Sequence, residues 1–381
     1  QHQQEMAQLG VAPIDLVVVN LYPFQQTVAK PSVTLDEALE NIDIGGPTLL
    51  RAAAKNYKDV IVIVDPEDYP TILNEITQGG IAESKRLALA QKAFHHTARY
   101  DRAIFSYLSG IGEPRPEKFP ESLTTTYTRV QSLRYGENPH QEAAFYRGEE
   151  ESGGWGDAKI LWGKEMSYNN FLDADSALAL VSEFESPAAV VVKHNNPCGV
   201  ATAETPLVAF KNARATDPTS AFGGVVAVNC PITEGLAEEI TSTFMEVVVA
   251  PDVEPGALAV FQKKKNLRVI TVSPPASPSF DFRKIAGGLL VQDPNQHVLK
   301  DATQYRVVTH RAPTPEEVEA LLFSWKVCKH VKSNAIILAH PGVTVGIGAG
   351  QMSRVDSVQI AMMKAQSPVT GTVMASDAFF P

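Results

Sequence analysis

Short apolar runs alternate with helix-periodic segments over the first third of the chain. Residues 16–19 and 60–64 are continuous apolar runs, typical of parallel strands buried on both faces. Leu87, Ala90, Phe94, Ala98 and Ile104 recur at helical spacing and predict one face of a long helix that runs to about residue 108. This alternation of strand and helix predicts an α/β fold class.

Two helix starts are marked in the same part of the chain. Thr34 and Glu37 fit a capping box, in which the threonine oxygen accepts from a first-turn amide and the glutamate reaches back. Gly45 and Gly46 precede a strongly helical run. Amide groups at such a turn can bind an anion.

The second part of the chain contains a repeated pattern. An apolar strand at 190–192, a glycine-containing turn, a helix at 207–215 and the stretch SAFGGVVAV come first. AIILA, a turn in VGIGAG, a helix at 358–364 and GTVMASDAFF follow in the same order. The pattern predicts two similar α/β subdomains, joined by a surface connection at VSPPASPSF.

A stretch rich in proline, glycine and charge, residues 110–123, separates the two parts. We therefore expect a first domain at residues 1–112, a linker at 113–130 and a second domain at 131–381. The second domain divides into subdomains at about 131–300 and 301–381.

Composition narrows the range of partners. The chain of 381 residues has 43 acidic and 33 basic residues and a net charge of −10, which gives no general attraction to nucleic acid or to an anionic membrane. Three cysteines without a CxxC pair favour a reducing compartment, and the cytoplasm is the expected location. No apolar stretch approaches the roughly 20 residues needed to cross a bilayer. Both ends look cut, so we expect a piece of a longer protein.

Lys193 and His194 are the first candidates for chemistry. They follow the valine strand directly, where ligands collect outside the carboxyl ends of strands in doubly wound sheets. A histidine can move a proton near neutral pH, and a lysine can stabilise a developing anion. Alternatively, the lysine reaches to solvent and the histidine bonds to backbone.

Two other chemistries can be weighed at the same segment. A zinc deaminase needs a glutamate two residues after the histidine and a Pro-Cys-x-x-Cys motif, but Asn196 stands at the first position and Ala201 at the last. A zinc hydrolase is therefore disfavoured. Cys198 could act as a nucleophile, although a cysteine after proline in a turn is more often packing material.

Three polar or glycine-rich segments add candidate binding residues. In RYGENPHQ, Arg134 can bind an anion and Tyr135 can stack on a ligand, or the segment is a linker with a tyrosine anchor. Gly223 and Gly224 in DPTSAFGG permit close approach of backbone to a ligand, or form a tight turn. GIGAGQMSR lacks the third glycine of a dinucleotide fingerprint.

Taken together and in this order, RYGENPHQ, KHNNPCGVA, DPTSAFGG, VKSNAI, GIGAGQMSRV and ASDAFFP resemble one family of purine-synthesis enzymes. This family joins phosphoribosylaminoimidazolecarboxamide (AICAR) formyltransferase to IMP cyclohydrolase. VVVNLYPF and NIDIGGPTLLRAAAKN look like its cyclohydrolase half. The resemblance implies a partial methylglyoxal-synthase-like domain followed by two cytidine-deaminase-like α/β subdomains, the last one incomplete at its C-terminus.

The resemblance also implies the reactions. A formyl group passes from 10-formyltetrahydrofolate, the co-substrate, to AICAR, and the product closes with loss of water to IMP. His194 would take the proton of the attacking amino group, and Lys193 would steady the oxyanion or protonate the departing folate nitrogen. Asn334 would support the same transition state through its amide. The residues matching positions that the family uses around this nucleotide are Arg134, Tyr135, Gly223, Glu246 and Arg354.

In the first domain, Tyr22, Asp43 and Lys55 match the ring-closing residues of the family, while Asn20, Ile44 and Gly45 would line the nucleotide. Lys55 could instead be an ordinary surface lysine and Asp43 a helix cap. Sections that the family has before NLYPF and after ASDAFFP are absent here. We therefore expect little ring closure and reduced or absent formyl transfer from this piece.

The resemblance further implies a homodimer, no metal in the chemistry, and no nucleic-acid or membrane partner. A regulatory protein that binds purine nucleotides without chemistry is the alternative. Such a binder would need Arg134 and Arg354 but would have no use for the joint presence of the reactive residues Lys193, His194, Tyr22 and Lys55.

Overall fold

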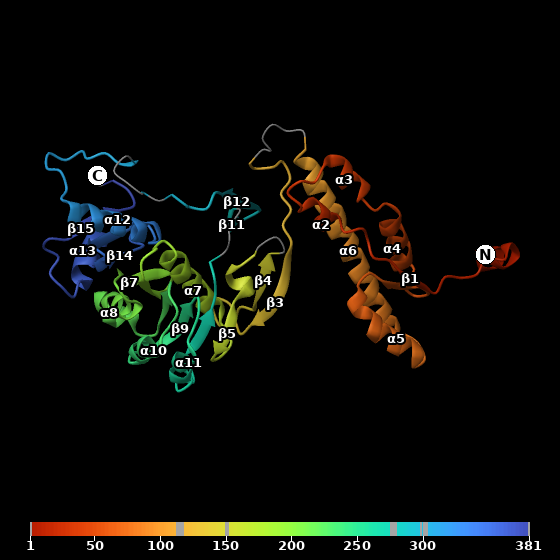
Figure 1. Ribbon diagram of the computed structural model, residues 1–381, viewed down its shortest axis with the longest axis horizontal. Coiled ribbons are helices and arrows are strands. Elements are labelled where there is room, and N and C mark those ends of the chain that lie inside the picture. The colour runs from red at the N-terminus through yellow and green to blue at the C-terminus, as the bar shows by residue number, and fades with distance from the viewer. Residues whose placement is uncertain are drawn as a thin grey trace. The chain divides into compact units, whose positions relative to one another are not determined.

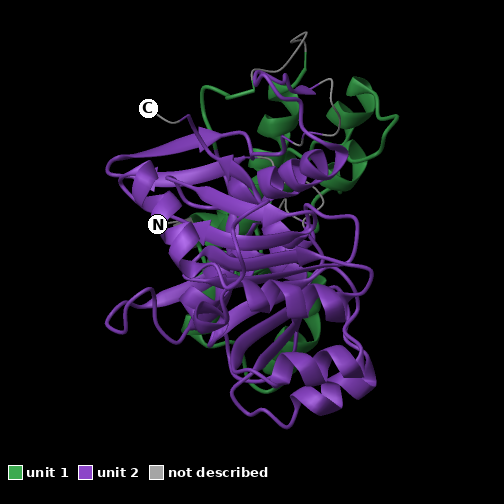
Figure 2. Ribbon diagram, turned by 90° about the vertical axis from the view of Figure 1, so that its left-hand side faces the viewer, with its two compact units in different colours: residues 1–123 green, residues 124–381 purple. Residues whose placement is uncertain are grey.

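The computed structural model describes residues 2–111, 118–148, 152–274, 280–297, 299 and 304–379. Residues 113–117 of the expected linker and 275–279 of the expected surface connection lie outside this part. The chain divides into two compact units, residues 1–123 and 124–381, which Figure 2 colours separately. The division falls inside the stretch where the sequence changes composition. None of the described helices is long and apolar enough to cross a membrane.

Unit 1 is built mainly from helices around a two-stranded sheet (Figure 1). Its elements are α1 (His2–Leu9), β1 (Leu16–Val18), α2 (Phe24–Val28), α3 (Leu35–Glu40), α4 (Gly45–Lys55), β2 (Ile61–Ile63), the 3₁₀ turn η1 (Pro66–Asp68), α5 (Tyr69–Thr77) and α6 (Glu83–Ser109). The predicted capping box is present at α3, where Thr34 accepts from the amide of Glu37 and the Glu37 side chain reaches back.

The two strands of unit 1 pair in parallel, as predicted, but only one of them is fully buried. All three residues of β2 are buried, whereas Leu16 and Val18 of β1 are 41% and 45% exposed. The expectation that residues 16–19 are buried on both faces is wrong. Val17 and Val19 pack against the core of unit 1, whereas the side chains that alternate with them, Leu16 and Val18, face away from it.

The predicted face of helix α6 is also partly wrong. Leu87 and Phe94 are each 40% exposed, while Leu89, Ala90 and Ala93 are buried. Helix α6 packs against α4 and β2, and of its predicted face only Ala90 is among its fully buried residues.

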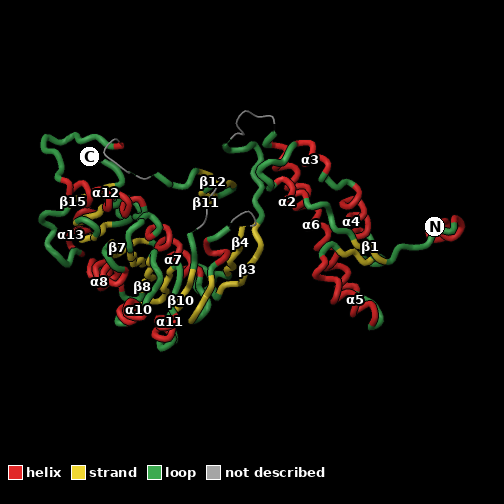
Figure 3. Tube along the Cα trace, in the orientation of Figure 1, coloured by secondary structure: helices red, strands yellow, loops and turns green. Residues whose placement is uncertain are grey.

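Unit 2 is a mixed α/β layer around a nine-stranded sheet. Figure 3 shows its strands in yellow and its helices in red. Its first elements are β3 (Tyr127–Leu133), β4 (Ala143–Gly148), η2 (Gly154–Asp157), β5 (Lys159–Trp162), α7 (Tyr168–Val181), β6 (Ala188–Lys193), β7 (Asn196–Thr202), α8 (Pro206–Thr216), α9 (Pro218–Ala221) and β8 (Gly224–Val228). They are followed by α10 (Glu234–Thr241), β9 (Met245–Ala250), α11 (Pro255–Phe261), β10 (Arg268–Thr271), β11 (Asp281–Ile285), β12 (Gly288–Gln292), α12 (Pro315–Lys329), β13 (Ile336–His340), β14 (Val343–Gly348), α13 (Arg354–Lys364) and β15 (Val373–Ser376).

The predicted repeat is visible in the topology of the sheet. The strand order is β15-β13-β14-β7-β6-β8-β9-β10-β5. In each repeat a helix precedes an antiparallel hairpin, a second helix follows the hairpin, and a third strand pairs antiparallel with the first strand. The units α7-β6-β7-α8-β8 and α12-β13-β14-α13-β15 therefore have the same connectivity. They meet at β7 and β14, in one continuous sheet.

This topology corrects two expectations. β6 runs antiparallel to both of its neighbours, so Lys193 does not end a strand of a parallel, doubly wound sheet. Residues 345–348 form part of β14 and not a turn. A Cβ at Gly346 or Gly348 would overlap the backbone of α13, so these glycines let the helix pack closely on the strand.

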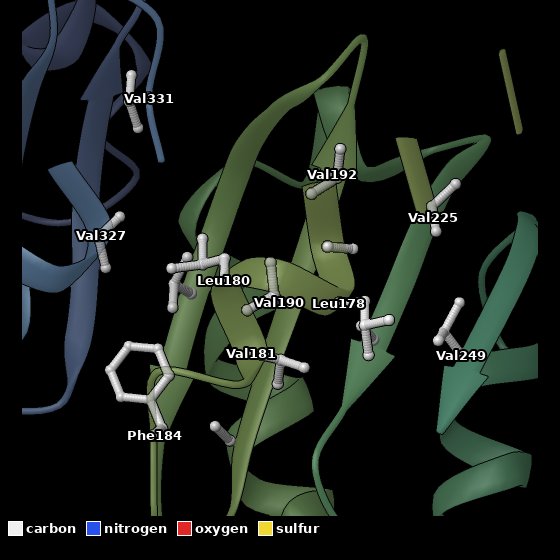
Figure 4. Packing of buried hydrophobic residues seen from close by; sticks show 14 of the residues in the cluster. Leu178, Leu180, Val181, Phe184, Val190, Val192, Val225, Val249, Val327 and Val331 are labelled. Atoms are coloured by element: carbon white, nitrogen blue, oxygen red, sulfur yellow. The ribbon is translucent and has the colours of Figure 1, made fainter. Parts of the chain in front are cut away.

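Both faces of the β6 region are covered, which explains its unbroken apolar sequence. Val190 and Val192 join a core cluster with α7 and α12, and Figure 4 shows them beside Leu178, Leu180, Val327 and other members. Val191 and Ala189 join a second cluster, with α8, α10 and α11. Burial on both faces is typical of strands with such continuous apolar runs.

Candidate active site

The Lys193–His194 segment is a tight turn of a β-hairpin. Lys193 pairs with Asn196, and the two residues between them, His194 and Asn195, have φ angles of +51° and +61°. Positive φ at both central residues is the geometry of the two-residue turns that match strand twist. The amide of Asn195 donates to Asp173 Oδ1 of α7 at 2.7 Å. The hairpin thus presents the exposed His194 side chain on a turn that is fixed at its backbone.

The ammonium group of Lys193 is held by backbone carbonyls. Its Nζ donates to the Gly223 carbonyl at 2.5 Å and lies 3.5 Å from the Phe222 carbonyl. Gly223 has a φ of +69°, and its amide donates to the Phe244 carbonyl at 2.7 Å. The structure therefore brings Lys193 and Gly223 together.

A cleft of about 360 Å³ opens between the two repeats beside this hairpin. We call it the seam cleft. It is lined by Lys193, His194, Asn196, Pro197, Cys198, Thr216, Asp217, Ser220, Gly346, Ile347, Ala349, Gln351, Ile360, Met363 and Lys364. Its polar walls come from both repeats, so a ligand there would touch β6, β7 and α13 at once.

Asn334 and Arg354 lie together at the start of β13 and α13. Arg354 Nη2 donates to Asn334 Oδ1 at 2.7 Å, and Asn334 Nδ2 donates to the carbonyls of Gln351 at 2.8 Å and Met352 at 3.1 Å. Gln351 also lines the seam cleft. The Asn334 amide is thus engaged at both its oxygen and its nitrogen, next to a residue of the cleft wall.

Asp377 completes this group. Burial would raise the pKa of its carboxyl, but hydrogen bonds from Ser333, Arg354 and the amide of Ala335 hold the pKa at about 2. The carboxylate therefore stays charged and keeps the Arg354 guanidinium in place.

Arg134, Tyr135 and Glu246 line a second cleft, of about 460 Å³, which we call the Arg134 cleft. Its other lining residues are Gly163, Lys164, Glu165, Ser167, Asn170 and Arg268. The Arg134 guanidinium lies 5.5 Å from the centre of the Tyr135 ring, and Asn170 Nδ2 donates to Glu246 Oε2 at 3.0 Å. The cleft combines the cations Arg134, Lys164 and Arg268 with the carboxylates Glu165 and Glu246, a set that suits an anionic ligand that also carries N–H groups.

In unit 1 the predicted site residues lie in two separate groups. Asp43 Oδ1 accepts from the amide of Gly46 at 2.7 Å, and the amide of Asp43 donates to the hydroxyl of Tyr100 at 2.8 Å. Burial raises the pKa of Tyr100, the hydrogen bond from the Asp43 amide opposes this rise, and the charges of Asp43, Asp101 and Tyr22 add to it. Tyr22 itself is 55% exposed.

The remaining predicted residues of unit 1 lie around α4 and β1. Asn20 Nδ2 donates to the Tyr69 hydroxyl at 3.2 Å, and Ile44, 73% exposed, precedes Gly45 at the start of α4. Lys55 is exposed at the other end of α4. With a rise of about 1.5 Å per residue, the helix separates its two ends by roughly 15 Å. The structure does not bring Lys55 next to Asp43.

Cys198 is a poor nucleophile in this setting. Burial, followed by the negative charge of Asp217, raises the pKa of its thiol to about 12, although part of its surface faces the seam cleft. Its Sγ lies 3.5 Å from the Val191 carbonyl. Among the described residues, no group of three or more His, Cys, Asp or Glu side chains is arranged to hold a metal ion.

Comparison with known proteins identifies the family. The family model described as "AICARFT/IMPCHase bienzyme" matches residues 53–364, and the model described as "MGS-like domain" matches residues 1–48. A "Bifunctional purine biosynthesis protein PurH" of Thermoanaerobacter sp. (strain X514) is 49% identical over 100% of this chain and 74% of its own length. The chain belongs to the AICARFT/IMPCHase bienzyme family.

Other similar proteins agree with this. The protein of the same name from Sorangium cellulosum (strain So ce56) is 51% identical over 99% of this chain and 75% of its own length. A solved structure titled "Crystal structure of ForH" is 39% identical and the match covers 29% of this chain and 58% of that chain, with a TM-score of 0.25.

Membership of the AICARFT/IMPCHase family confirms the resemblance inferred from the motifs. It also confirms the α/β fold class with an MGS-like first part, and the expected enzyme class, a formyltransferase joined to a cyclohydrolase. The comparisons give no support to a binding protein without chemistry.

Sequence reasoning missed several polar residues of this AICARFT/IMPCHase chain. Arg268 lines the Arg134 cleft, where burial lowers the pKa of its guanidinium and the charge of Glu246 opposes that shift. The position of Arg268 at the start of an apolar strand could have marked it as a candidate binding residue. Asp217 and Lys364 in the seam cleft lie 147 residues apart, and no local sequence pattern indicates that they meet.

Proposed function

We propose that unit 2 carries out formyl transfer from 10-formyltetrahydrofolate to AICAR in the seam cleft. The observation that supports this is the hairpin turn on which His194 stands exposed, next to a lysine fixed on the Gly223 carbonyl. A proton acceptor and a cation side by side, on a fixed backbone, suit the attack of a weak amine on a formyl carbon.

The proposed step is balanced by these two groups. The amino nitrogen of AICAR attacks the formyl carbon, and His194 accepts the proton that the nitrogen loses. The carbonyl oxygen becomes an oxyanion, and Lys193 donates to it. An ammonium has three donors, and the carbonyls of Phe222 and Gly223 engage at most two of them. The bond to the folate nitrogen then breaks, this nitrogen receives the proton that His194 took up, and tetrahydrofolate leaves.

We assign the nucleotide to the Arg134 cleft and its surroundings. Arg134 would bind the phosphate, Tyr135 would stack, and Glu246 would accept from ring or carboxamide N–H groups. Arg354 and Asn334, which bond to each other beside the cleft residue Gln351, would act from the second repeat, and Gly223 would leave room for the approach of substrate to Lys193. No metal is needed for these steps.

For ring closure we propose unit 1, in which Tyr22 and Asp43 transfer the protons. The nucleotide is lined by Asn20, Ile44 and Gly45. The hydrogen bond between the Asp43 amide and the Tyr100 hydroxyl and the electrostatic effect of Tyr22 on Tyr100 support this assignment. A role for Lys55 requires a substrate that extends along α4. We also propose a homodimer that acts in the cytoplasm, without nucleic-acid or membrane partners.

Formyl transfer is tested by mixing the chain with AICAR and 10-formyltetrahydrofolate and following release of tetrahydrofolate. We expect release by the wild type and a loss of at least about 100-fold in His194→Ala, the size typical of a missing general base. Equal release by wild type and variant would show that His194 has no part in the step.

A further inference from the structure

The 217–223 segment carries both carbonyl groups that hold Lys193. It begins at Asp217, passes through the four-residue helix α9 and ends at Phe222 and Gly223. The Lys193 ammonium bonds to the last two carbonyls of this segment. The position of that ammonium therefore depends on the position of the segment.

A residue of the second repeat fixes the start of this segment. Lys364, the last residue of α13, places its Nζ 2.7 Å from Asp217 Oδ2 and 2.8 Å from Ser220 Oγ. The other carboxylate oxygen, Asp217 Oδ1, accepts from the amide of Ser220 at 3.0 Å. The two ends of α9 are thus linked to each other and to α13.

This ion pair differs from an ordinary surface pair. The Asp217 side chain is 9% exposed and that of Lys364 is 40% exposed, so the carboxylate has little water to replace a lost partner. Burial would raise the pKa of Asp217, but the bonds from Lys364 and Ser220 lower it below the usual value. A helix of four residues cannot hold itself by its own hydrogen bonds.

The contact also crosses the boundary between the repeats. α8 ends at Thr216, whose hydroxyl donates to the Thr344 carbonyl of β14 at 2.8 Å, and Asp217 follows at once. The carboxyl ends of α8 and α13 therefore meet at the seam. Two helix carboxyl ends carry partial negative charge, and the Lys364 cation offsets it.

We propose that Lys364 is a positioning residue for formyl transfer, acting through Asp217 and α9 to fix the carbonyls that hold Lys193. The inference rests on the proposed function of the seam cleft. It means that the second repeat, which does not carry Lys193 or His194, sets the geometry of the lysine in the first.

A labelling experiment tests the link without turnover. The full chain is treated with limiting acetic anhydride, and acetylation at each lysine is measured by mass spectrometry. In Lys364→Met we expect Lys193 to be acetylated at least about threefold faster than in the wild type, because acetylation proceeds through the neutral amine and a nitrogen released from its two carbonyl acceptors is accessible to the reagent. Lys364→Arg should restore the wild-type rate, since an arginine can also bind the Asp217 carboxylate.

The matched control is Lys211→Met, which removes a lysine from an ion pair of α8 with Glu239. Its Lys193 should react at the wild-type rate. Should Lys364→Met fail to fold, Asp217→Asn gives the same test, because the amide keeps an acceptor for Ser220 and weakens the pair. Unchanged Lys193 acetylation in the folded variant would overturn the proposal.

Kinetics separate this inference from the proposed function. If the wild type transfers formyl groups, we expect Lys364→Met to lower kcat about tenfold with the KM for AICAR nearly unchanged, as for a misplaced catalytic group. An unchanged kcat would refute the role in catalysis. If the wild type transfers nothing, the proposed function fails, while the labelling result still decides whether Lys364 fixes Lys193.

Discussion

Lys193 stands out at the residue scale because a charged side chain follows directly on a buried valine run. That local pattern predicted polar surroundings, but the acceptors of its ammonium group lie 29 and 30 residues further on. Pairing of β6 with β8, in the register Val192↔Val225, brings them together. Local patterns could therefore indicate the reactive residues, whereas their contacts depend on sheet register, which a single sequence does not contain. For the same reason, the sequence did not indicate the contact between Asp217 and Lys364.

Gly223→Ala should weaken formyl transfer through two effects. Alanine at a φ of +69° costs on the order of 1 kcal/mol. Its methyl group would also lie 3.1 Å from Lys193 Nζ. We expect kcat to fall about tenfold, since the ammonium must move. The measurement is release of tetrahydrofolate, together with a melting curve.

The control for backbone strain is Gly287→Ala. Gly287 has a φ of +73°, and a Cβ there meets nothing within 4 Å. Each variant should lower the melting temperature by about 2–4 °C, but only the change at Gly223 should lower kcat. Equal kcat values of the two variants would show that the contact with Lys193 does not affect catalysis.

At the scale of elements, the sequence predicted the helices and strands that follow from a single local pattern. The continuous apolar run of β6 is buried on both faces because helices cover both sides. The same rule failed at β1, where alternate side chains are exposed. The glycines of β14 serve helix packing and not the expected turn, so residue type misled there, whereas the turn at His194-Asn195 has positive φ without a glycine.

Asp377 joins three elements and should make stability depend on pH. It follows β15 and bonds to Arg354 at the start of α13 and to the amide of Ala335 before β13. Its folded pKa of about 2 lies below the usual 3.8. The carboxylate therefore stabilises the fold above about pH 4, and this contribution is lost as the pH falls through 2.

Asp377→Asn should be less stable than the wild type by roughly 2 kcal/mol at pH 7, and the difference should shrink between pH 4 and pH 2. Urea unfolding at pH 7, 4 and 3 measures it. Asp281→Asn, a change at an exposed carboxylate of β11, controls for net charge. A difference that stays constant with pH would exclude this role for the Asp377 carboxylate.

At the scale of the whole molecule, composition located the boundary between the units better than it located any contact. Residues 110–123 lose apolar periodicity, and the contacts divide at residue 123. The hydrophobic clusters found among the described residues each lie within one unit. Each unit therefore has the core that an independent domain needs. The assignment of one reaction to each unit remains a proposal.

Residues 124–381 should consequently fold and act alone. The nine-stranded sheet and three of the clusters lie wholly inside this range. We expect the isolated unit to melt in one transition that coincides with a transition of the full chain, and to transfer formyl groups with the same kcat within about twofold, because its proposed site draws no residue from unit 1. His194→Ala in both forms is the control. An isolated unit that aggregates, or that becomes active only when residues 1–123 are added, would show that unit 1 contributes to this site.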